Sequence, residues 1–556
     1  MKSLLLIFAA VLSTTAQLYA QCPEGETKIN LDINNVNAHL RVGSALWHDD
    51  FGGYEVPFLD LPFDGPSVLY SGGLWIGGVT AAGELKLAAQ EYTGTGLHDY
   101  SPGPLNSDGT TSVFNCLNWD RFWEMTVIEV EAHRNDFEDN GVIDAKLGSI
   151  YGWPGKANPH FLIENGFILE AEYGEMAPFV DVNGDGIYNP DDGDYPDIKG
   201  DKAIWWVFND VGSDHTQSGG QQIGAQVNCL AYAYDTEVVA IDEASYYVFS
   251  IYNKGSDDLL DMYTGLWVDF DLGCFIDDRV AYDTTRQMVI AYNEDAVDGD
   301  GSAGFCPGGA STYLQSPPVV GIRLIEDSNN SGVTSLGVIN YRGIGASPAT
   351  TNPQVSNEYY NYLQGRWRDG QPFTLSADGY TGTDVTPYLG TNEYFETAAG
   401  MTVCNEEEVG DQRAIMSTSG GTLVSGGAPQ VLKYAVVFSR EQNYPCPDWS
   451  AIQEVSDVVA EEAIVATSTQ ELSSKPIALY PNPTNDQLTV EITASIAVGT
   501  AVQLSVINAQ GEMMYKTIKS NAGRHTINCH QWPVGSYLLL FQDGLGVLTT
   551  SKFVKL

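Results

Sequence analysis

This sequence of 556 residues is poor in basic residues and has no long apolar run. Lysine and arginine together number 26, against 72 aspartates and glutamates, so the formal net charge is −46. Because phosphate groups are bound by basic patches, this balance excludes nucleic acid as a partner and disfavours an anionic membrane surface. No stretch reaches the roughly 18 apolar residues of a transmembrane helix, so we expect no membrane span.

Signatures of common catalytic sites are also missing. The sequence contains no H-E-x-x-H, no P-loop and no G-x-S-x-G. One G-x-G-x-x-G occurs at residues 299–304, but Pro307-Gly308-Gly309 follows and opposes the helix that a dinucleotide site requires. The eight histidines are scattered, without metal-ligand spacing. We therefore lean against an enzyme, although a glycosidase would need only two carboxylates across a cleft, which no spacing reveals.

Cysteine is scarce, and none of the eight residues forms a C-x-x-C pair, so a zinc ribbon or thioredoxin-like site is not expected. An exported location would permit disulfides. Cys274–Cys306 and Cys404–Cys446 are candidate pairs. Only Cys529 lies in the C-terminal segment, so an odd number remains in front of it. At least one of those thiols is then free or pairs between chains.

The abundant residues favour a β protein. The chain has 58 glycines, 30 tyrosines and 11 tryptophans, and short apolar segments are separated by clusters of Gly, Pro, Asn and Asp. We predict strands at residues 68–76, 122–130, 203–208, 226–234, 245–253, 263–270, 287–292, 319–325 and 431–438. Tryptophans within such segments are expected to belong to the core. Residues 447–466 instead repeat apolar side chains at three- and four-residue steps, which predicts a helix.

About the last 80 residues carry the most specific pattern. They open with Tyr480-Pro481-Asn482-Pro483-Thr484, alternate apolar and polar residues over 488–492 and 502–506, and pass Gly535-Ser536-Tyr537 before a basic, apolar end. Short strands separated by turns predict a β-sandwich. In this order, the segments resemble the C-terminal (type A) sorting domain of cargo of the type IX secretion system in Gram-negative bacteria. The resemblance implies an Ig-like fold and the secretion machinery as partner. It also implies transit through the periplasm to the outer-membrane surface or the medium.

The other end of the chain agrees with export. Lys2 gives a basic start, residues 4–12 form an apolar run too short to span a bilayer, and Ala16 and Ala20 are candidate cleavage positions. We therefore expect a signal peptide at residues 1–20 and a β-rich body at 21–466, with a candidate subdomain boundary near residue 255. A polar linker at 467–475 and the sorting domain at 476–556 follow.

The strongest chemical motif is the acidic loop at residues 181–192. Side-chain oxygens occupy loop positions 1, 3, 5, 9 and 12, a backbone carbonyl is offered at position 7, and Gly186 at position 6 permits the sharp turn. Pro178 and Pro190 oppose flanking EF-hand helices. The loop thus resembles those of dockerin or thrombospondin-type repeats, and a hydrogen-bonded acidic turn is the alternative. The predicted ligands of a structural calcium ion are Asp181, Asn183, Asp185, Ile187, Asn189 and Asp192.

Two weaker acidic sets are further metal candidates: residues 136–144, and Asp269, Asp271, Asp277 and Asp278. Residues 72–78 and 266–273 resemble segments of an exported body type that has no assigned activity. Together, these patterns predict a mainly β chain with a multi-domain β-sandwich-type body, one helix before the linker and an Ig-like sorting domain. The expected function is a calcium-stabilised surface protein of adhesion or envelope structure. The alternative is a secreted polysaccharide hydrolase or glycan-binding module, with glycans or surface proteins as partners.

Overall fold

The computed structural model describes residues 21–49, 52–57, 65–236, 238–301, 304–315, 317–340, 348–375, 379–389, 409–440, 449–467, 477–480, 484–492, 502–508, 513–519, 523–542 and 548–555. The chain divides into two compact units, Met1–Ala466 and Thr467–Leu556. The predicted signal peptide and most of the predicted linker lie outside the described residues.

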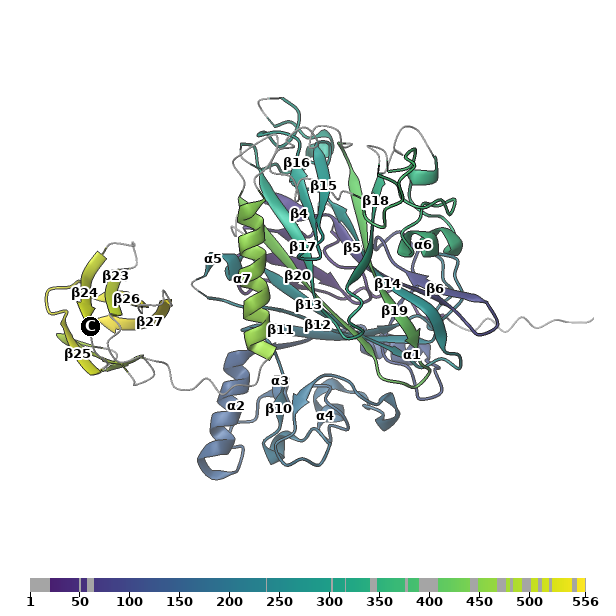
Figure 1. The fold of residues 1–556 in the computed structure, drawn as a ribbon. Helices are drawn as coiled ribbons and strands as arrows, with labels where there is room; N and C mark the ends of the chain where they lie inside the picture. Colours follow the sequence, from purple (N-terminus) through teal and green to yellow (C-terminus); the bar gives the residue numbers. More distant parts are fainter. Residues whose placement is uncertain are drawn as a thin grey trace, which may run out of the picture. The chain divides into compact units, whose positions relative to one another are not determined.

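The body is built on a large antiparallel sheet of nine strands (Figure 1). Its order is β15-β16-β17-β20-β13-β12-β11-β7, and β8 also pairs with β11. The strands are β7 (Ser101–Pro102), β8 (Trp123–Thr126), β11 (Lys202–Asn209), β12 (Ala225–Ala233), β13 (Ser245–Asn253), β15 (Asp278–Asp283), β16 (Met288–Asn293), β17 (Pro318–Asp327) and β20 (Gln430–Arg440).

A second sheet of five strands packs on one face of the large sheet. Its order is β18-β19-β14-β5-β6, with strands β18 (Val333–Asn340), β19 (Gln412–Leu423), β14 (Leu259–Phe270), β5 (Ser71–Val79) and β6 (Leu85–Ala89). Leu74 and Leu266 of this sheet share one buried core with Trp206 and Cys229 of the large sheet. The two sheets therefore form a β-sandwich. Four short strands extend it at one side: β1 (Lys28–Leu31), β2 (Asn37–Arg41), β3 (Tyr54–Glu55) and β4 (Ser67–Leu69).

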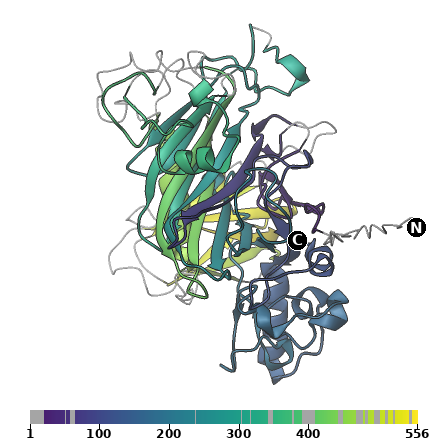
Figure 2. The same ribbon diagram turned by 90° about the vertical axis from the view of Figure 1, so that its right-hand side faces the viewer.

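Further segments cover the outer faces of both sheets. Helix α7 (Ser450–Thr467) and the long segment between β7 and β11 bury the outer face of the large sheet. That segment contains α1 (Val113–Trp119), α2 (Val127–Asn140), α3 (Gly148–Tyr151), α4 (Phe161–Asn165) and the strands β9 (Phe179–Val180) and β10 (Tyr195–Pro196). Helix α6 (Ser356–Leu363) packs on Trp75 and Trp267 of the smaller sheet and lies in front of its strands in Figure 2. A short helix, α5 (Val239–Asp242), precedes β13.

The mainly β prediction is confirmed, and most predicted strands correspond to observed ones. The strand predicted at residues 122–130 is wrong in its second half, because β8 ends at Thr126 and α2 begins at Val127. The side chain of Thr126 accepts a hydrogen bond from the backbone of Glu129, whose own side chain caps Thr126 in return. The helix predicted at residues 447–466 is confirmed as α7. Both sheets combine strands from before and after residue 255, which lie side by side in two blocks within each sheet.

Two disulfides lie among the described residues. Cys274–Cys306 was predicted, whereas Cys22–Cys116 was not. Cys404 and Cys446 lie outside the described residues. Cys229 is a free, buried thiol, which confirms that the body carries an unpaired cysteine.

The C-terminal unit is a second, smaller β-sandwich. One sheet has the order β21-β22-β25 and the other β24-β23-β26-β27. Leu488, Val490, Leu504 and Ile527 form a core between the sheets. The strands are β21 (Ile477–Tyr480), β22 (Gln487–Ile492), β23 (Val502–Asn508), β24 (Met513–Lys519), β25 (Gly523–Asn528), β26 (Gly535–Gln542) and β27 (Leu548–Lys555).

Candidate functional site

The acidic loop at residues 181–192 is held at its base by a short β pair. Strands β9 and β10 pair antiparallel, with Val180 opposite Tyr195, and so close the loop. Within it, the buried ring of Tyr188 packs edge-on against Phe179, and its hydroxyl donates to the carbonyl of Ile150 at 2.7 Å. Apart from the buried Pro190, the rest of the loop is exposed or half-buried. The fold therefore presents this loop at the surface on a fixed base.

The first half of the loop is organised by its own backbone. Asp181 accepts hydrogen bonds from the N–H groups of Gly184 and Gly186, each at 2.7 Å, and Asp185 Oδ1 accepts from Ile187 at 2.8 Å. Gly184 and Gly186 have φ of 76° and 78°, a region that glycine adopts without strain. Carboxylate oxygens have further lone pairs, so these bonds orient the side chains without exhausting their capacity as ligands.

The second half of the loop brings the remaining predicted side-chain ligands together. Asp192 accepts from the amide of Asn189 at 2.6 Å and from that of Asn183 at 3.4 Å. No described ion pair involves Asp181, Asp185 or Asp192. An oxygen-rich loop without a basic partner has the chemistry that calcium prefers.

Two aspartates near the end of this loop have other roles. Asp191 points away from it, toward Lys146 at 2.7 Å and His160 at 3.2 Å. Asp194 is buried and accepts from the backbone N–H groups of Val182 and Asn189 at 2.8 and 2.9 Å. Burial raises the pKa of Asp194, and these two hydrogen bonds oppose the rise. Sequence spacing did not single out Asp194 as a brace, because no loop position requires it.

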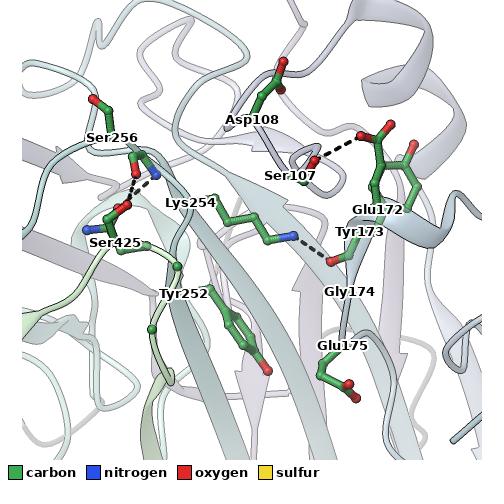
Figure 3. Close-up of a pocket in the computed structure, with 14 residues that line it drawn as sticks. Ser107, Asp108, Glu172, Tyr173, Gly174, Glu175, Tyr252, Lys254, Ser256 and Ser425 are labelled. Carbon is green, nitrogen blue, oxygen red and sulfur yellow. Dashed lines mark hydrogen bonds between the residues drawn. The ribbon is translucent and has the colours of Figure 1, made fainter.

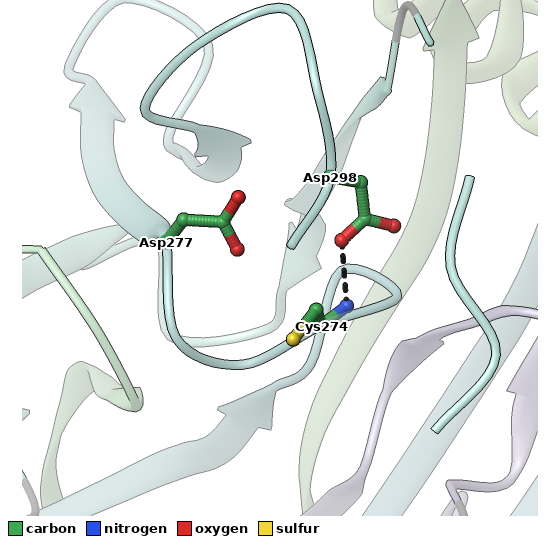
Figure 4. Close-up of side chains that lie close together, drawn as sticks. All are labelled: Cys274, Asp277 and Asp298. Carbon is green, nitrogen blue, oxygen red and sulfur yellow. Dashed lines mark hydrogen bonds between the residues drawn. The ribbon is translucent and has the colours of Figure 1, made fainter. Parts of the chain in front are cut away.

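The weaker acidic sets have different outcomes. Residues 136–140 belong to helix α2, and Asp136 accepts from the N–H groups of Asp144 and Ala145 at 2.9 Å each, so the predicted loop there is wrong. The second set divides into two groups. Asp269 and Asp271 gather with Asp411, whereas Asp277 gathers with Asp298 and Cys274 (Figure 4); within each group, three ligand atoms lie within 4.8 Å.

The group at Asp269 contains a protein cation. Arg413 lies 3.3 Å from Asp269 and 2.9 Å from Asp411, and the hydroxyl of Tyr92 donates to Asp269 at 2.7 Å. Burial raises the pKa of Asp269 to about 7, although Arg413 opposes this. The arrangement is a buried ion pair with a hydrogen-bonded tyrosine.

A cavity of about 450 Å³ opens elsewhere on the body (Figure 3). Tyr252, Glu172 and Glu175 line it, and Lys254 reaches across it to donate to the carbonyls of Tyr173 and Leu105 at 2.6 and 3.1 Å. Burial lowers the pKa of Lys254 to about 8. The cavity combines carboxylates and hydroxyls with an aromatic ring, as polar ligand sites do.

The tryptophans of the predicted strands are buried, which confirms that they belong to the core: Trp75, Trp123, Trp205, Trp206 and Trp267. Trp119 and Trp367 are buried as well, so none of these rings is exposed for stacking on a sugar.

Comparison with known proteins identifies the C-terminal unit. Residues 478–555 match the family described as the secretion system C-terminal sorting domain. The chain is therefore cargo of the type IX secretion system, exported to the cell surface or the medium. Among the described residues, no helix is both long and apolar enough to cross a membrane.

The comparisons with curated proteins and with solved structures are uninformative. No curated protein matches the chain. A DUF3244 family protein from Bacteroides vulgatus with an immunoglobulin-like β-sandwich fold is 17% identical, over 16% of this chain and 90% of its own, with a TM-score of 0.14. A polysaccharide lyase is 8% identical, over 59% of this chain and 34% of its own, with a TM-score of 0.17. Both TM-scores are too low to support an argument.

Proposed function

We propose that this exported chain is a calcium-stabilised surface protein that acts in adhesion or envelope structure. The observation that carries the proposal is the loop at residues 181–192. Its predicted side-chain ligands are positioned by hydrogen bonds within the loop and have no described basic partner. Calcium binds six to eight oxygens, and the loop offers five side chains and the carbonyl of Ile187. A divalent ion there would relieve the repulsion among Asp181, Asp185 and Asp192.

The packing of the body supports a structural role. Both faces of the large sheet and the outer face of the smaller sheet are covered by buried side chains. The long segment between β7 and β11, which carries the loop, covers much of the large sheet. An ion that fixes this segment stabilises only the folded state, so it raises the free energy of unfolding by mass action. We propose that binding of this ion accounts for the cluster of carboxylates in the loop.

The test is to count bound calcium and measure stability together. Native mass spectrometry of the purified, mature chain should show Asp185→Ala carrying one calcium ion fewer than the wild type. Calcium addition should then raise the melting temperature of the variant less than that of the wild type. Asp139→Ala, which removes an exposed aspartate from helix α2, is the matched control and should retain every ion. An unchanged ion count in Asp185→Ala would contradict the calcium assignment.

Glycan binding is the second candidate, and the cavity beside Tyr252 favours it. A half-buried aromatic ring next to Glu172, Glu175 and Ser425 offers stacking and hydrogen bonding to a sugar. A glycan array probed with the wild type and with Tyr252→Ala tests this. Binding that the substitution abolishes would support a glycan-binding module, whereas no binding by the wild type would remove this candidate.

A further inference from the structure

A second group of buried oxygens lies where strand β15 begins and strand β16 ends. The Cys274–Cys306 disulfide closes the loop around this position. Asp278, the first residue of β15, lies directly opposite Asn293, the last residue of β16. Side chains of directly opposed residues share one face of the sheet. Asn293 also donates from its amide nitrogen to Asp277 Oδ2 at 2.8 Å. Asn293 therefore lies beside both Asp277 and Asp278.

Each of these three side chains leaves one oxygen without a hydrogen-bond partner. Oδ1 of Asp277, Oδ1 of Asp278 and Oδ1 of Asn293 are all buried and unpartnered. Asp278 and Asn293 are 0% exposed, and Asp277 is 8% exposed. Leaving a buried polar atom unsatisfied costs about 1–3 kcal/mol, and more for a charged group. Three such oxygens on neighbouring buried side chains indicate that a bound group supplies the missing partner.

The other oxygens of the carboxylates are held by backbone donors. Oδ2 of Asp278 accepts from Leu272 at 3.0 Å, and Oδ2 of Asp277 accepts from Gly299 at 2.9 Å. Asp298 lies beside Asp277 (Figure 4) and is fixed by the N–H groups of Cys274 and Tyr313 at 2.9 and 2.5 Å. Such supporting bonds orient the ligands of metal sites.

No described cation neutralises this group. The described ion pairs include neither Asp277, Asp278 nor Asp298, and the neighbouring Arg279 pairs with Glu294 at 3.2 Å. Cys274 contributes no thiolate, because its sulfur is bonded to Cys306. The group thus consists of buried oxygens without a cationic side chain, in contrast to the Asp269 group with its Arg413.

We propose that Asp277, Asp278 and Asn293 bind a divalent cation, with calcium as the ion of best fit, and that Asp298 adds negative charge beside it. Hard oxygens without nitrogen or thiolate ligands favour calcium over zinc or copper. The ion links the ends of β15 and β16 to the disulfide-closed loop. This site is separate from the loop at residues 181–192 and does not depend on it.

The test uses the mature chain carrying Asp185→Ala, which removes calcium binding at residues 181–192. Calcium alone is the probe. Adding Asp278→Asn should remove one further calcium ion by native mass spectrometry. The order of the melting temperatures of the double variant and of Asp185→Ala should also differ between calcium and chelator. In calcium the double variant should melt below Asp185→Ala, whereas in chelator it should melt at or above it, because Asn removes an uncompensated buried charge. Asp300→Asn, an exposed change in the same loop, is the control.

Two outcomes would overturn the proposal: an unchanged ion count, or an equal loss of melting temperature with and without calcium, which a purely structural role predicts. Asn293→Asp provides a second variant if Asp278→Asn does not fold. It should widen the difference in melting temperature between calcium and chelator. If no cation binds here, the added charge would lower stability equally in both conditions. The calcium count of the single variant Asp185→Ala tests calcium binding at residues 181–192 independently.

Discussion

Glu91 is a buried acid whose protonation is linked to folding. It is 5% exposed at the inner edge of the α6 layer, and the hydroxyl of Tyr359 donates to it at 3.0 Å. Burial raises its pKa from 4.5 to about 7, against the opposing effect of the Tyr359 hydrogen bond. A raised pKa means that the folded state keeps a proton that the unfolded chain loses.

We expect Glu91→Gln to remove one source of pH-dependent stability. The contribution of Glu91 is fully present below pH 4.5 and is lost as the pH rises through about 7. Each pKa unit corresponds to about 1.4 kcal/mol, so the free energy of unfolding of the variant should gain roughly 3 kcal/mol on the wild type between pH 4.5 and 7.5. Urea titrations across this range measure it. Glu84→Gln, at an exposed position, should show a constant difference, and the same constant difference in Glu91→Gln would contradict the assignment.

Residue-level prediction is possible where candidate ligands are close in sequence. The loop at residues 181–192 could be proposed as a calcium site because such loops repeat their donors at fixed short spacing. Asn293 could not be recognised, because it meets Asp278 only through the pairing of β15 with β16. The signal for such a site is a cross-strand register, which a single sequence does not contain.

Helix α7 stabilises the body by burying one apolar face. Ile452 is 1% exposed and belongs to the core on the outer face of the large sheet, while Val458 of the same helix is 36% exposed. Asp457 adds ion pairs to Arg286 and Arg323 at 2.8 and 3.0 Å. The partly exposed ion pairs contribute little compared with the buried side chains.

Ile452→Ala should therefore cost about 2–5 kcal/mol of unfolding free energy, since it leaves a cavity in a packed core. Val458→Ala, a truncation on the exposed side of the same helix, should cost less than about 1 kcal/mol. Denaturant unfolding monitored by tryptophan fluorescence compares the two. Equal losses would mean that α7 does not pack on the sheet as described.

Sequence periodicity identified α7 and missed α2 for a physical reason. In α2 only Val130 and His133 are buried, so the helix has almost no apolar stripe, and the apolar residues just before it favour a strand. The missed signal was the capping box formed by Thr126 and Glu129. The order of the strands in the sheets could not be predicted from the sequence either. β5 pairs with β14 and β13 with β20, across long stretches of chain.

At the scale of the whole molecule, the two units have separate cores. Each of the three body clusters contains only body residues, and the cluster around Leu488 contains only residues of the C-terminal unit. Folding of the body therefore does not require burial of any described side chain of the sorting domain. The sorting domain carries the export address, and the body carries the candidate ion sites.

A chain that ends at Thr467 should fold normally but fail to leave the cell. Its thermal transition should coincide with that of the body in the full chain, because the body cores remain complete. In the native host it should accumulate in the periplasm, since residues 478–555 are missing. Cell fractionation and circular dichroism measure the two outcomes. Secretion of the shortened chain would contradict the role of the sorting domain, and a lower melting temperature would contradict independent folding.

The unpaired thiols supply a reporter of opening for each unit. Cys229 is 1% exposed in the core between the body sheets, and Cys529 is fully buried in the C-terminal unit. An alkylating reagent can reach either sulfur only when its own sandwich opens. Peptide mapping distinguishes labelling at these two sites from labelling at Cys404 and Cys446. The two labelling rates therefore report the opening rate of each unit separately. The native chain thus allows the opening of both units to be followed without an engineered cysteine.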